Sequence, residues 1–359
     1  MRAVMYESVG GPLQIRSMPD PECPVDGAVI AVQATGVCRS DWHAWRGHDP
    51  VPLPMIPGHE FAGVVQSVGP EVREFAVGDR VTAPFVNACG RCTTCAAGQG
   101  QVCPNQTQPG FTHPGSYAEL VAVRAADINL VRLPDSIDAV TAAALGCRFA
   151  TAFHALTAQS QPQPGEWVAV FGCGGVGLSA VLIATALGAR VVGVDPSPAA
   201  CQRASELGAE AVFTQFDSAV IADLTGGGVA VSVDAVGSAA TAAASVRALR
   251  RRGRHVQVGL MLDAAAHAAL PWSELVAKEL EVVGSHGMAA SDYPRLLAMI
   301  ASGHLEVSRL LGRVVAFEQL PVELAAMDDL IAQSAGIVVA RVSGVDSGSL
   351  PQDGGKGDA

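Results

Sequence analysis

The pattern of apolar and polar residues changes about 150 residues into the chain. Before that point, short alternating runs separated by Gly and Pro predict a mostly β unit, with strands near 27–35, 63–68 and 78–83. After a segment rich in Gln and Pro at 159–165, apolar runs alternate with helical patterns. These runs predict strands at 166–171, 190–194, 210–213, 231–236, 255–258 and 280–284, with helices at 175–187 and 198–207.

This alternation of strands and helices predicts an α/β fold with a doubly wound parallel sheet. A helix at 292–301 and a strand at 337–342 are expected to return to the first unit, so that the parallel sheet is an insertion within the β unit. We therefore expect one domain from residues 1–148 and 287–345 and a second from 149–286. The final residues, 346–359, are rich in Gly and Asp and predict a mobile tail.

Composition and charge exclude several classes of protein. Among 359 residues, 49% are hydrophobic and 16% charged, and no apolar run reaches the roughly 18 residues of a membrane span. The start of the chain lacks the apolar region of a signal peptide, so we expect a cytoplasmic protein. The net charge is −11 and Arg250–Arg252 is the longest basic run, so neither nucleic acid nor a membrane is expected as a partner.

A glycine-rich motif follows the predicted strand at 166–171 and opens the helix at 175–187. Its residues are Gly172, Cys173, Gly174, Gly175, Val176 and Gly177. Glycines at these positions permit a tight turn, close approach of a pyrophosphate and close packing of helix on strand, and the helix N-terminus attracts the phosphates. The motif therefore predicts a Rossmann-type dinucleotide site, and the alternative is a glycine turn without a ligand.

Asp195 stands at the end of the second strand of this unit, eighteen residues after Gly177. An acidic side chain at this point accepts hydrogen bonds from the adenosine ribose hydroxyls and repels a 2′-phosphate. The residue therefore favours NAD over NADP. The alternative is that Asp195 caps the following helix, because capping selects the same residue type.

Four cysteines lie within fifteen residues, at Cys89, Cys92, Cys95 and Cys103. Four thiolates in one loop match a closed tetrahedral zinc site, which leaves no open position for chemistry and so stabilises structure. An iron–sulfur cluster is the main alternative, because clusters also take four cysteines.

A second group of metal-ligand residues is dispersed: Cys38, the segment Gly58-His59-Glu60, and Cys147. With the cysteine loop and the glycine motif, these residues stand in the order and approximate spacing of one family, and the sequence resembles the zinc-dependent medium-chain alcohol dehydrogenases. The resemblance covers nearly the whole chain and implies a GroES-like catalytic domain around a Rossmann domain. It also implies two zinc ions per chain, the catalytic one held by Cys38, His59 and Cys147 with a fourth position open.

The resemblance also implies roles for residues around this zinc. Glu60 lies just behind the metal, Asp41 accepts the other N–H of His59, and Ser40 and His43 pass a proton outward. Residues expected to contact the cofactor, beside the glycines and Asp195, are Arg39, Thr151, Val176, Val258 and Leu260. Those expected in or near the substrate pocket are Trp42, Trp45, Phe85 and again Leu260, although a tryptophan packs in a core more often than in a pocket.

The activity implied is a zinc- and NAD-dependent interconversion of alcohols with aldehydes or ketones, by hydride transfer from a zinc-bound alkoxide, on medium-chain aliphatic or aromatic alcohols. A polyol dehydrogenase of the same superfamily is the alternative, but such relatives tend to carry a carboxylate where Cys147 stands. A zinc-free reductase would lack both cysteine sets. A zinc-ribbon binding protein fits the acidic charge poorly. The family also suggests a homo-oligomer, a tetramer or a dimer.

Overall fold

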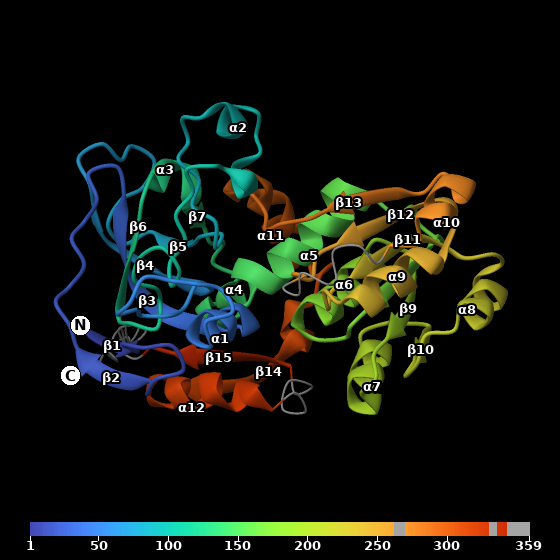
Figure 1. Ribbon diagram of the computed structural model, residues 1–359. Helices are drawn as coiled ribbons and strands as arrows, with labels where there is room; N and C mark the ends of the chain where they lie inside the picture. The colour runs from blue at the N-terminus through green and yellow to red at the C-terminus, as the bar shows by residue number, and fades with distance from the viewer. Residues whose placement is uncertain (262–269, 330–335, 343–359) are drawn as a thin grey trace, which may run out of the picture.

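Two large sheets dominate the structure, and the chain passes from one to the other and back (Figure 1). The computed structural model describes residues 1–261, 270–329 and 336–342. The predicted mobile tail, 346–359, lies outside the described residues. Within them, no helix is both long and apolar enough to cross a membrane.

The β-rich lobe contains a mixed sheet of seven strands and a separate hairpin. The hairpin pairs β1 (Arg2–Met5) with β2 (Gln14–Ser17). The large sheet runs in the order β14-β15-β3-β4-β5-β7, with β6 paired to β3. Its strands are β3 (Ala28–Val37), β4 (Phe61–Val68), β5 (Arg80–Thr82), β6 (Leu120–Val123), β7 (Val131–Arg132), β14 (Leu311–Ala316) and β15 (Ile337–Arg341). Because β15 pairs antiparallel with β3, the end of the chain returns to the first lobe, as predicted.

The second lobe is built on a parallel sheet of six strands, in the order β10-β9-β8-β11-β12-β13. Its strands are β8 (Trp167–Phe171), β9 (Arg190–Val194), β10 (Ala211–Phe213), β11 (Val229–Asp234), β12 (Leu249–Gln257) and β13 (Glu281–Gly284). This order, which reverses at β8 and β11, is the doubly wound Rossmann arrangement predicted from the sequence.

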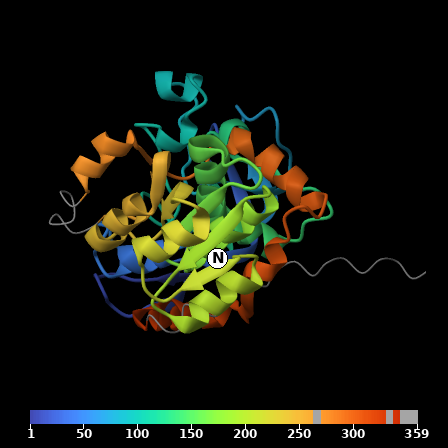
Figure 2. The ribbon, with the colours of Figure 1, turned by 90° about the vertical axis from the view of Figure 1, so that its right-hand side faces the viewer.

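Both faces of the parallel sheet are buried, which explains why its strands read as apolar runs. Val168 and Val170 of β8 pack in one core cluster, whereas Ala169 and Phe171 pack in another on the opposite face. Helices therefore cover both sides (Figure 2).

The helices are short, and twelve α-helices lie within the described residues. Those of the β-rich lobe and its connections are α1 (Arg39–Trp45), α2 (Thr93–Ala96), α3 (Ala126–Asn129), α4 (Ala139–Ala143), α5 (Ala150–His154), α11 (Tyr293–Ala301) and α12 (Leu320–Ala325). Those packed on the parallel sheet are α6 (Gly175–Ala186), α7 (Pro198–Glu206), α8 (Ser218–Thr225), α9 (Ala239–Arg247) and α10 (Trp272–Lys278).

The connection between the lobes is helical, with α5 at its centre (Figure 1). A π-helical turn, Leu145–Phe149, precedes α5, and a second, Ala155–Ser160, follows it. Wide turns of this kind occur often at functional sites, and the first one carries Cys147.

The strands lie within two residues of their predicted bounds except β12, and β11 is shifted at both ends. β12 begins six residues before the predicted strand at 255–258, because Arg250, Arg252 and Arg254 hide its apolar pattern. These arginines form ion pairs with Glu166, Glu279 and Glu281 and lie on the solvent side. β11 ends before Val236, where the Asp234 carboxylate accepts the N–H groups of Val236 and Gly237 and turns the chain.

Candidate active site

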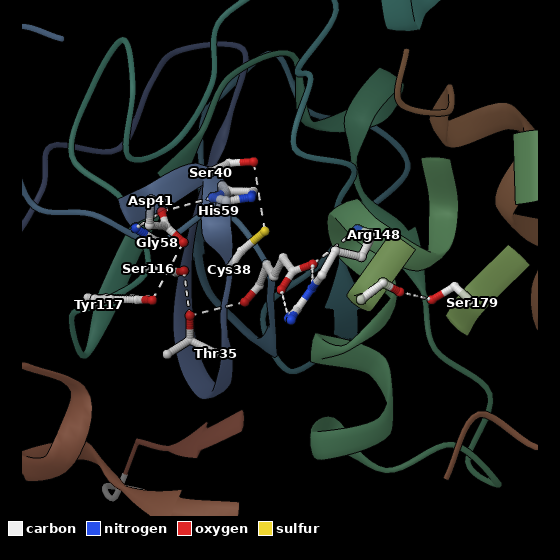
Figure 3. A network of polar contacts seen from close by, with 12 residues as sticks. Thr35, Cys38, Ser40, Asp41, Gly58, His59, Ser116, Tyr117, Arg148 and Ser179 are labelled. Carbon is white, nitrogen blue, oxygen red and sulfur yellow. Dashed lines mark hydrogen bonds and ion pairs between the residues drawn. The ribbon is translucent and has the colours of Figure 1, made fainter. Parts of the chain in front are cut away.

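The three dispersed metal-ligand residues meet in the structure. Figure 3 shows two of them, Cys38 and His59. Cys38 directly follows β3, His59 lies two residues before β4, and Cys147 lies in the π-helical turn ahead of α5. One donor atom from each lies within 4.8 Å of the other two. The pairing of β3 with β4 brings the first two together, and α4 packs on both strands and places the third.

The hydrogen bonds of His59 fix which of its nitrogens can bind a metal. Nδ1 lies 2.9 Å from Oδ1 of Asp41, and the same oxygen accepts the N–H of Gly58 at 2.8 Å. A carboxylate accepts only, so Nδ1 carries the proton and Nε2 has a free lone pair. Nε2 is buried without a hydrogen-bond partner among the described residues. An unpartnered buried nitrogen beside two thiols fits a metal ion that completes its bonding.

The two buried thiols influence each other's charge. Cys147, with Arg148 and His59 nearby, holds the pKa of Cys38 well below its usual range, whereas Cys38 and burial raise the pKa of Cys147 well above it. Two adjacent thiolates repel each other unless a cation lies between them. Two sulfurs and one imidazole are the donor set that zinc binds at sites with an open position.

The four-cysteine loop has the geometry of a closed zinc site. Its Sγ atoms lie 3.4 Å (Cys92 to Cys95), 3.8 Å (Cys92 to Cys103) and 4.0 Å (Cys89 to Cys95) apart. A tetrahedral zinc with bonds near 2.3 Å separates its sulfurs by about 3.8 Å, whereas a disulfide needs about 2.05 Å. The backbone N–H of Arg91 helps to lower the pKa of Cys89 to about 6, which favours the thiolate that binds metal.

Glu60 lies behind these ligands in an ion pair that the sequence did not predict. Its carboxylate is fully buried and contacts Arg148, whose Nε lies 3.2 Å from Oε1 and whose Nη2 lies 2.5 Å from Oε2. The backbone N–H of Arg148 also donates to Oε1 at 3.2 Å. The signal available in the sequence was a basic residue directly after a candidate ligand, Cys147.

The residues of the expected proton path lie on α1. Ser40 Oγ is 3.8 Å from Sγ of Cys38, and so lies beside a metal ligand. Nδ1 of His43 is 3.1 Å from Nδ1 of His48. Burial, with Arg39 and His48 nearby, lowers the pKa of His43 to about 4, so its imidazole is neutral at pH 7 and is a weak base that releases a proton readily.

Of the three expected pocket aromatics, Phe85 alone packs against the thiols: it forms one buried cluster with Cys38, Val86 and Cys147. Trp42 is close by in sequence but stacks on Arg39 and donates from Nε1 to Asp328 at 2.8 Å. Trp45 is buried in the core of the β-rich lobe and donates to the Gly11 carbonyl at 2.8 Å. Because this places Trp45 in the core, we omit it from the pocket.

Two aromatic rings of this region were not predicted. The Phe111 ring centre lies 5.2 Å from that of His59, and the His286 ring centre lies 5.3 Å from that of Phe85. Phe111 lies in a turn and His286 follows β13, and neither residue carries a local sequence signal.

The glycine turn after β8 has the conformation that its sequence predicts. Gly172 has φ +86°, and a side chain on Gly177 would collide with the Gly172 carbonyl at 1.7 Å. A side chain on Gly174 would meet nothing within 4 Å, so the turn is open on that side. The turn therefore leaves room for a ligand above the N-terminus of α6.

Asp195 directly follows β9 and holds two backbone N–H groups. Oδ2 accepts from Cys173 at 2.7 Å and Oδ1 from Ser197 at 2.8 Å. The cap of α7 is Ser197, whose Oγ accepts from Ala200 at 3.3 Å. The interpretation of Asp195 as a helix cap is therefore wrong.

A cleft lies between the lobes next to this turn. Among its lining residues are Arg39, Arg148, Gly175, Arg313 and Glu323. The remaining residues expected at the cofactor are Thr151, which is buried in α5; Val176, in the first turn of α6; Val258, directly after β12; and Leu260, which is 57% exposed.

The Rossmann sheet, the cleft beside it and the two sets of metal-ligand residues define a zinc-binding dehydrogenase. Two family models match the chain: the alcohol dehydrogenase GroES-like domain over residues 25–135 and the zinc-binding dehydrogenase over 175–302. An alcohol dehydrogenase from Geobacillus stearothermophilus is 36% identical over 312 residues, which cover 85% of this chain and 90% of that protein. The chain therefore belongs to the zinc-containing medium-chain alcohol dehydrogenase family and is an oxidoreductase.

Solved structures agree with this assignment. Alcohol dehydrogenase TADH from Thermus sp. ATN1 has 31% identity and a TM-score of 0.88, over 96% of this chain and 100% of that one. A zinc-binding dehydrogenase from Sinorhizobium meliloti 1021, bound to NADP, has 28% identity and a TM-score of 0.84, over 95% of this chain and 99% of that one.

Proposed function

We propose that the protein is an NAD-dependent zinc alcohol dehydrogenase that interconverts medium-chain aliphatic or aromatic alcohols with aldehydes or ketones. The observation that carries this proposal is the buried Nε2 of His59, which has no hydrogen-bond partner among the described residues and lies with Cys38 and Cys147 beside Phe85. A structural site would be closed by a fourth protein ligand, whereas three ligands leave a position for substrate.

The chain's own residues would hold zinc and move the proton. Zinc, when bound by Cys38, His59 and Cys147, acts as a Lewis acid that favours loss of the hydroxyl proton. Ser40 accepts this proton from the alcohol, because its hydroxyl lies beside Cys38. His43, farther along α1, would pass the proton on to solvent, because its pKa of about 4 means that it does not retain the proton at pH 7. NAD, when bound in the cleft, would supply the nicotinamide that accepts the hydride from the alcohol carbon.

The cofactor proposal rests on the turn after β8. The open side of Gly174 and the N–H groups at the start of α6 suit a pyrophosphate, and Arg39 in the same cleft supplies positive charge. Asp195 favours NAD because a carboxylate repels a 2′-phosphate. The NADP-bound relative shows that family membership alone does not decide this choice.

The substrate proposal rests on the rings near His59. Phe85 and Phe111 are apolar, and both lie edge-on to the His59 imidazole. Apolar walls favour aliphatic or aromatic chains over polyols, which need several hydrogen-bond partners. His286 packs on Phe85 and adds a polar group to this wall.

The test is a spectrophotometric screen of the zinc-loaded enzyme with a panel of alcohols and aldehydes, each with NAD and with NADP. We expect reduction of NAD by medium-chain or benzylic alcohols, two zinc ions per chain, and loss of activity in His59→Gln. Turnover of polyols alone would support the polyol alternative. Turnover that persists in a metal-free preparation would contradict the zinc mechanism.

Further features belong to the same proposal. We assign residues 1–148 and 287–345 to the catalytic domain and 149–286 to the cofactor domain. The nine cysteines form no disulfide, which suits a reducing cytoplasm. We also propose a homo-oligomer, a tetramer or a dimer, which sedimentation analysis would test.

A further inference from the structure

The ion pair between Arg148 and Glu60 reaches from the metal-ligand residues toward the cofactor cleft. Three N–H groups of Arg148, one from the backbone and two from the side chain, point to one carboxylate. Glu60 is fully buried and the Arg148 side chain is 10% exposed, so water screens the pair weakly. The pair thus fixes the position of Glu60 behind Cys38 and Cys147.

Arg148 also contacts the glycine turn. A side chain on Gly175, the first residue of α6, would lie 2.6 Å from Cδ of Arg148, so the arginine stem packs directly over the helix N-terminus. Both residues line the cleft. Nη1 of Arg148 has no hydrogen-bond partner in the described ranges, which leaves donors available beside the N–H groups that start α6.

We propose that Arg148 acts on two groups at once. It positions the Glu60 carboxylate behind the catalytic metal, and it binds a phosphate of the dinucleotide in the cleft. This inference rests on the proposed NAD binding. A guanidinium has five N–H donors in a planar fork, so it can bridge a carboxylate and a phosphate. The Glu60 carboxylate and the cofactor phosphate then share the positive charge of Arg148. Binding of the cofactor in the cleft therefore changes the electric field at the catalytic metal.

The first test measures dinucleotide affinity without turnover, by quenching of tryptophan fluorescence in the zinc-loaded enzyme. Arg148→Met should weaken NAD binding about 10- to 100-fold, as expected for the loss of a charge-assisted hydrogen bond, and Arg148→Lys should restore part of it. The matched control is Arg313→Met, which removes another arginine of the same cleft that pairs with Glu323. An equal loss of NAD affinity in both variants would mean that only the overall positive charge of the cleft matters, and it would overturn the proposal.

A double-mutant cycle separates this role from a structural one. Glu60→Gln should free Arg148 from its carboxylate and tighten NAD binding by about 3- to 10-fold. In the Arg148→Met background the same change should alter affinity less than about 2-fold, because Glu60 acts on the cofactor through Arg148. The double variant leaves no unpaired buried charge, so it keeps the test usable if Arg148→Met alone does not fold. Equal effects of Glu60→Gln in both backgrounds would contradict the coupling.

The coupling to the metal is tested with Co²⁺ at the catalytic site and ADP-ribose, which carries the phosphates but no nicotinamide. Saturating ADP-ribose should shift the thiolate-to-cobalt absorption band in wild type and in Arg313→Met, but not in Arg148→Met or Glu60→Gln. A shift of the same size in Arg148→Met would refute the bridging role. A wild type that binds no dinucleotide would refute the proposed function itself, whereas a binding wild type matched by Arg148→Met refutes only this inference.

Discussion

The backbone N–H of Cys173 donates a hydrogen bond of 2.7 Å to the carboxylate of Asp195, so the acid proposed to select NAD also holds the glycine turn in place. The other carboxylate oxygen holds the Ser197 N–H at 2.8 Å, at the start of the next helix. Asp195 therefore joins the ends of β8 and β9, and its replacement affects the conformation of the site as well as its charge.

Asp195→Ser should shift the relative preference toward NADP by about 1 to 3 kcal/mol, because the ribose hydrogen bonds and the repulsion of a 2′-phosphate are both lost. It should also lower the free energy of unfolding by about 1 to 3 kcal/mol, since two backbone N–H groups lose their acceptor. Kinetics with both cofactors and urea unfolding measure the two effects.

The control for this change is Asp217→Ala, because a serine at this position would still cap the helix. Asp217 also accepts two backbone N–H groups, from Ala219 and Val220, but it caps α8 instead of the glycine turn. This variant should have a lower free energy of unfolding than wild type and an unchanged cofactor preference. A wild type that already uses NADP better than NAD would show that our interpretation of Asp195 is wrong.

Ser40→Ala should lower kcat by about 100-fold or more, because the alcohol loses the hydroxyl that takes its proton. His43→Gln should lower kcat modestly, and added buffer should restore part of the loss, because solvent can replace a group near the surface. His48→Gln tests the partner of His43 and should have less effect than either. Full activity in Ser40→Ala would exclude the proposed path.

Replacing one cysteine from each site should separate the roles of the two metals. Cys147→Ser should remove up to one zinc per chain and abolish activity while the fold survives. Cys103→Ser should lower the free energy of unfolding by up to several kcal/mol, because metal binding and local folding are coupled. The enzyme that stays soluble should retain activity. Zinc content, melting temperature and specific activity are compared with wild type. A stable but inactive Cys103→Ser protein would reverse the two assignments.

The protein should lose stability as the pH falls below about 6.5, the pKa of a histidine in an unfolded chain. Burial lowers the pKa of His255, whose Nδ1 lies 2.9 Å from Ser245 Oγ and whose Nε2 lies 3.1 Å from Gln257 Oε1. The unfolded chain therefore binds a proton in a range where folded His255 does not, and this difference favours unfolding.

Urea midpoints at several values of pH measure this effect. His255→Gln, which cannot titrate, should show a smaller loss of stability between pH 7.5 and pH 5. The exposed His304→Gln is the control for removing one imidazole. An equal pH dependence in wild type and His255→Gln would contradict the argument.

Local patterns predicted most of the fold, because the buried strands of the parallel sheet are apolar on both faces and the glycine turn has few alternative conformations. The arginines of β12 concealed the start of that strand, since charged side chains lie on its exposed side. The cysteine loop could be recognised from its spacing alone. The catalytic ligands could not, because Cys38 and Cys147 meet only when α4 packs on β3 and β4. Resemblance to a family supplied that information.

Neither local sequence patterns nor resemblance to the family predicted the contacts of Arg148 and Phe111. Each depends on side chains that approach from distant segments: Glu60, 88 residues from Arg148, and His59 beside Phe111. Trp45 illustrates the opposite case, because resemblance to the family suggested a pocket while the packing of the lobe placed it in the core.

The spacing of the two cysteine sets has a consequence for the order in which metal enters. Cys89 and Cys103 are 14 residues apart, so their loop closes at small entropic cost without the rest of the fold. Cys38 and Cys147 are 109 residues apart and converge only after both β3 and α4 have docked. We expect a chain refolding in limiting zinc to fill the loop first and to regain its melting temperature before its activity. Zinc supply would then set the fraction of folded chains that are active, and folded protein alone would overstate the amount of working enzyme.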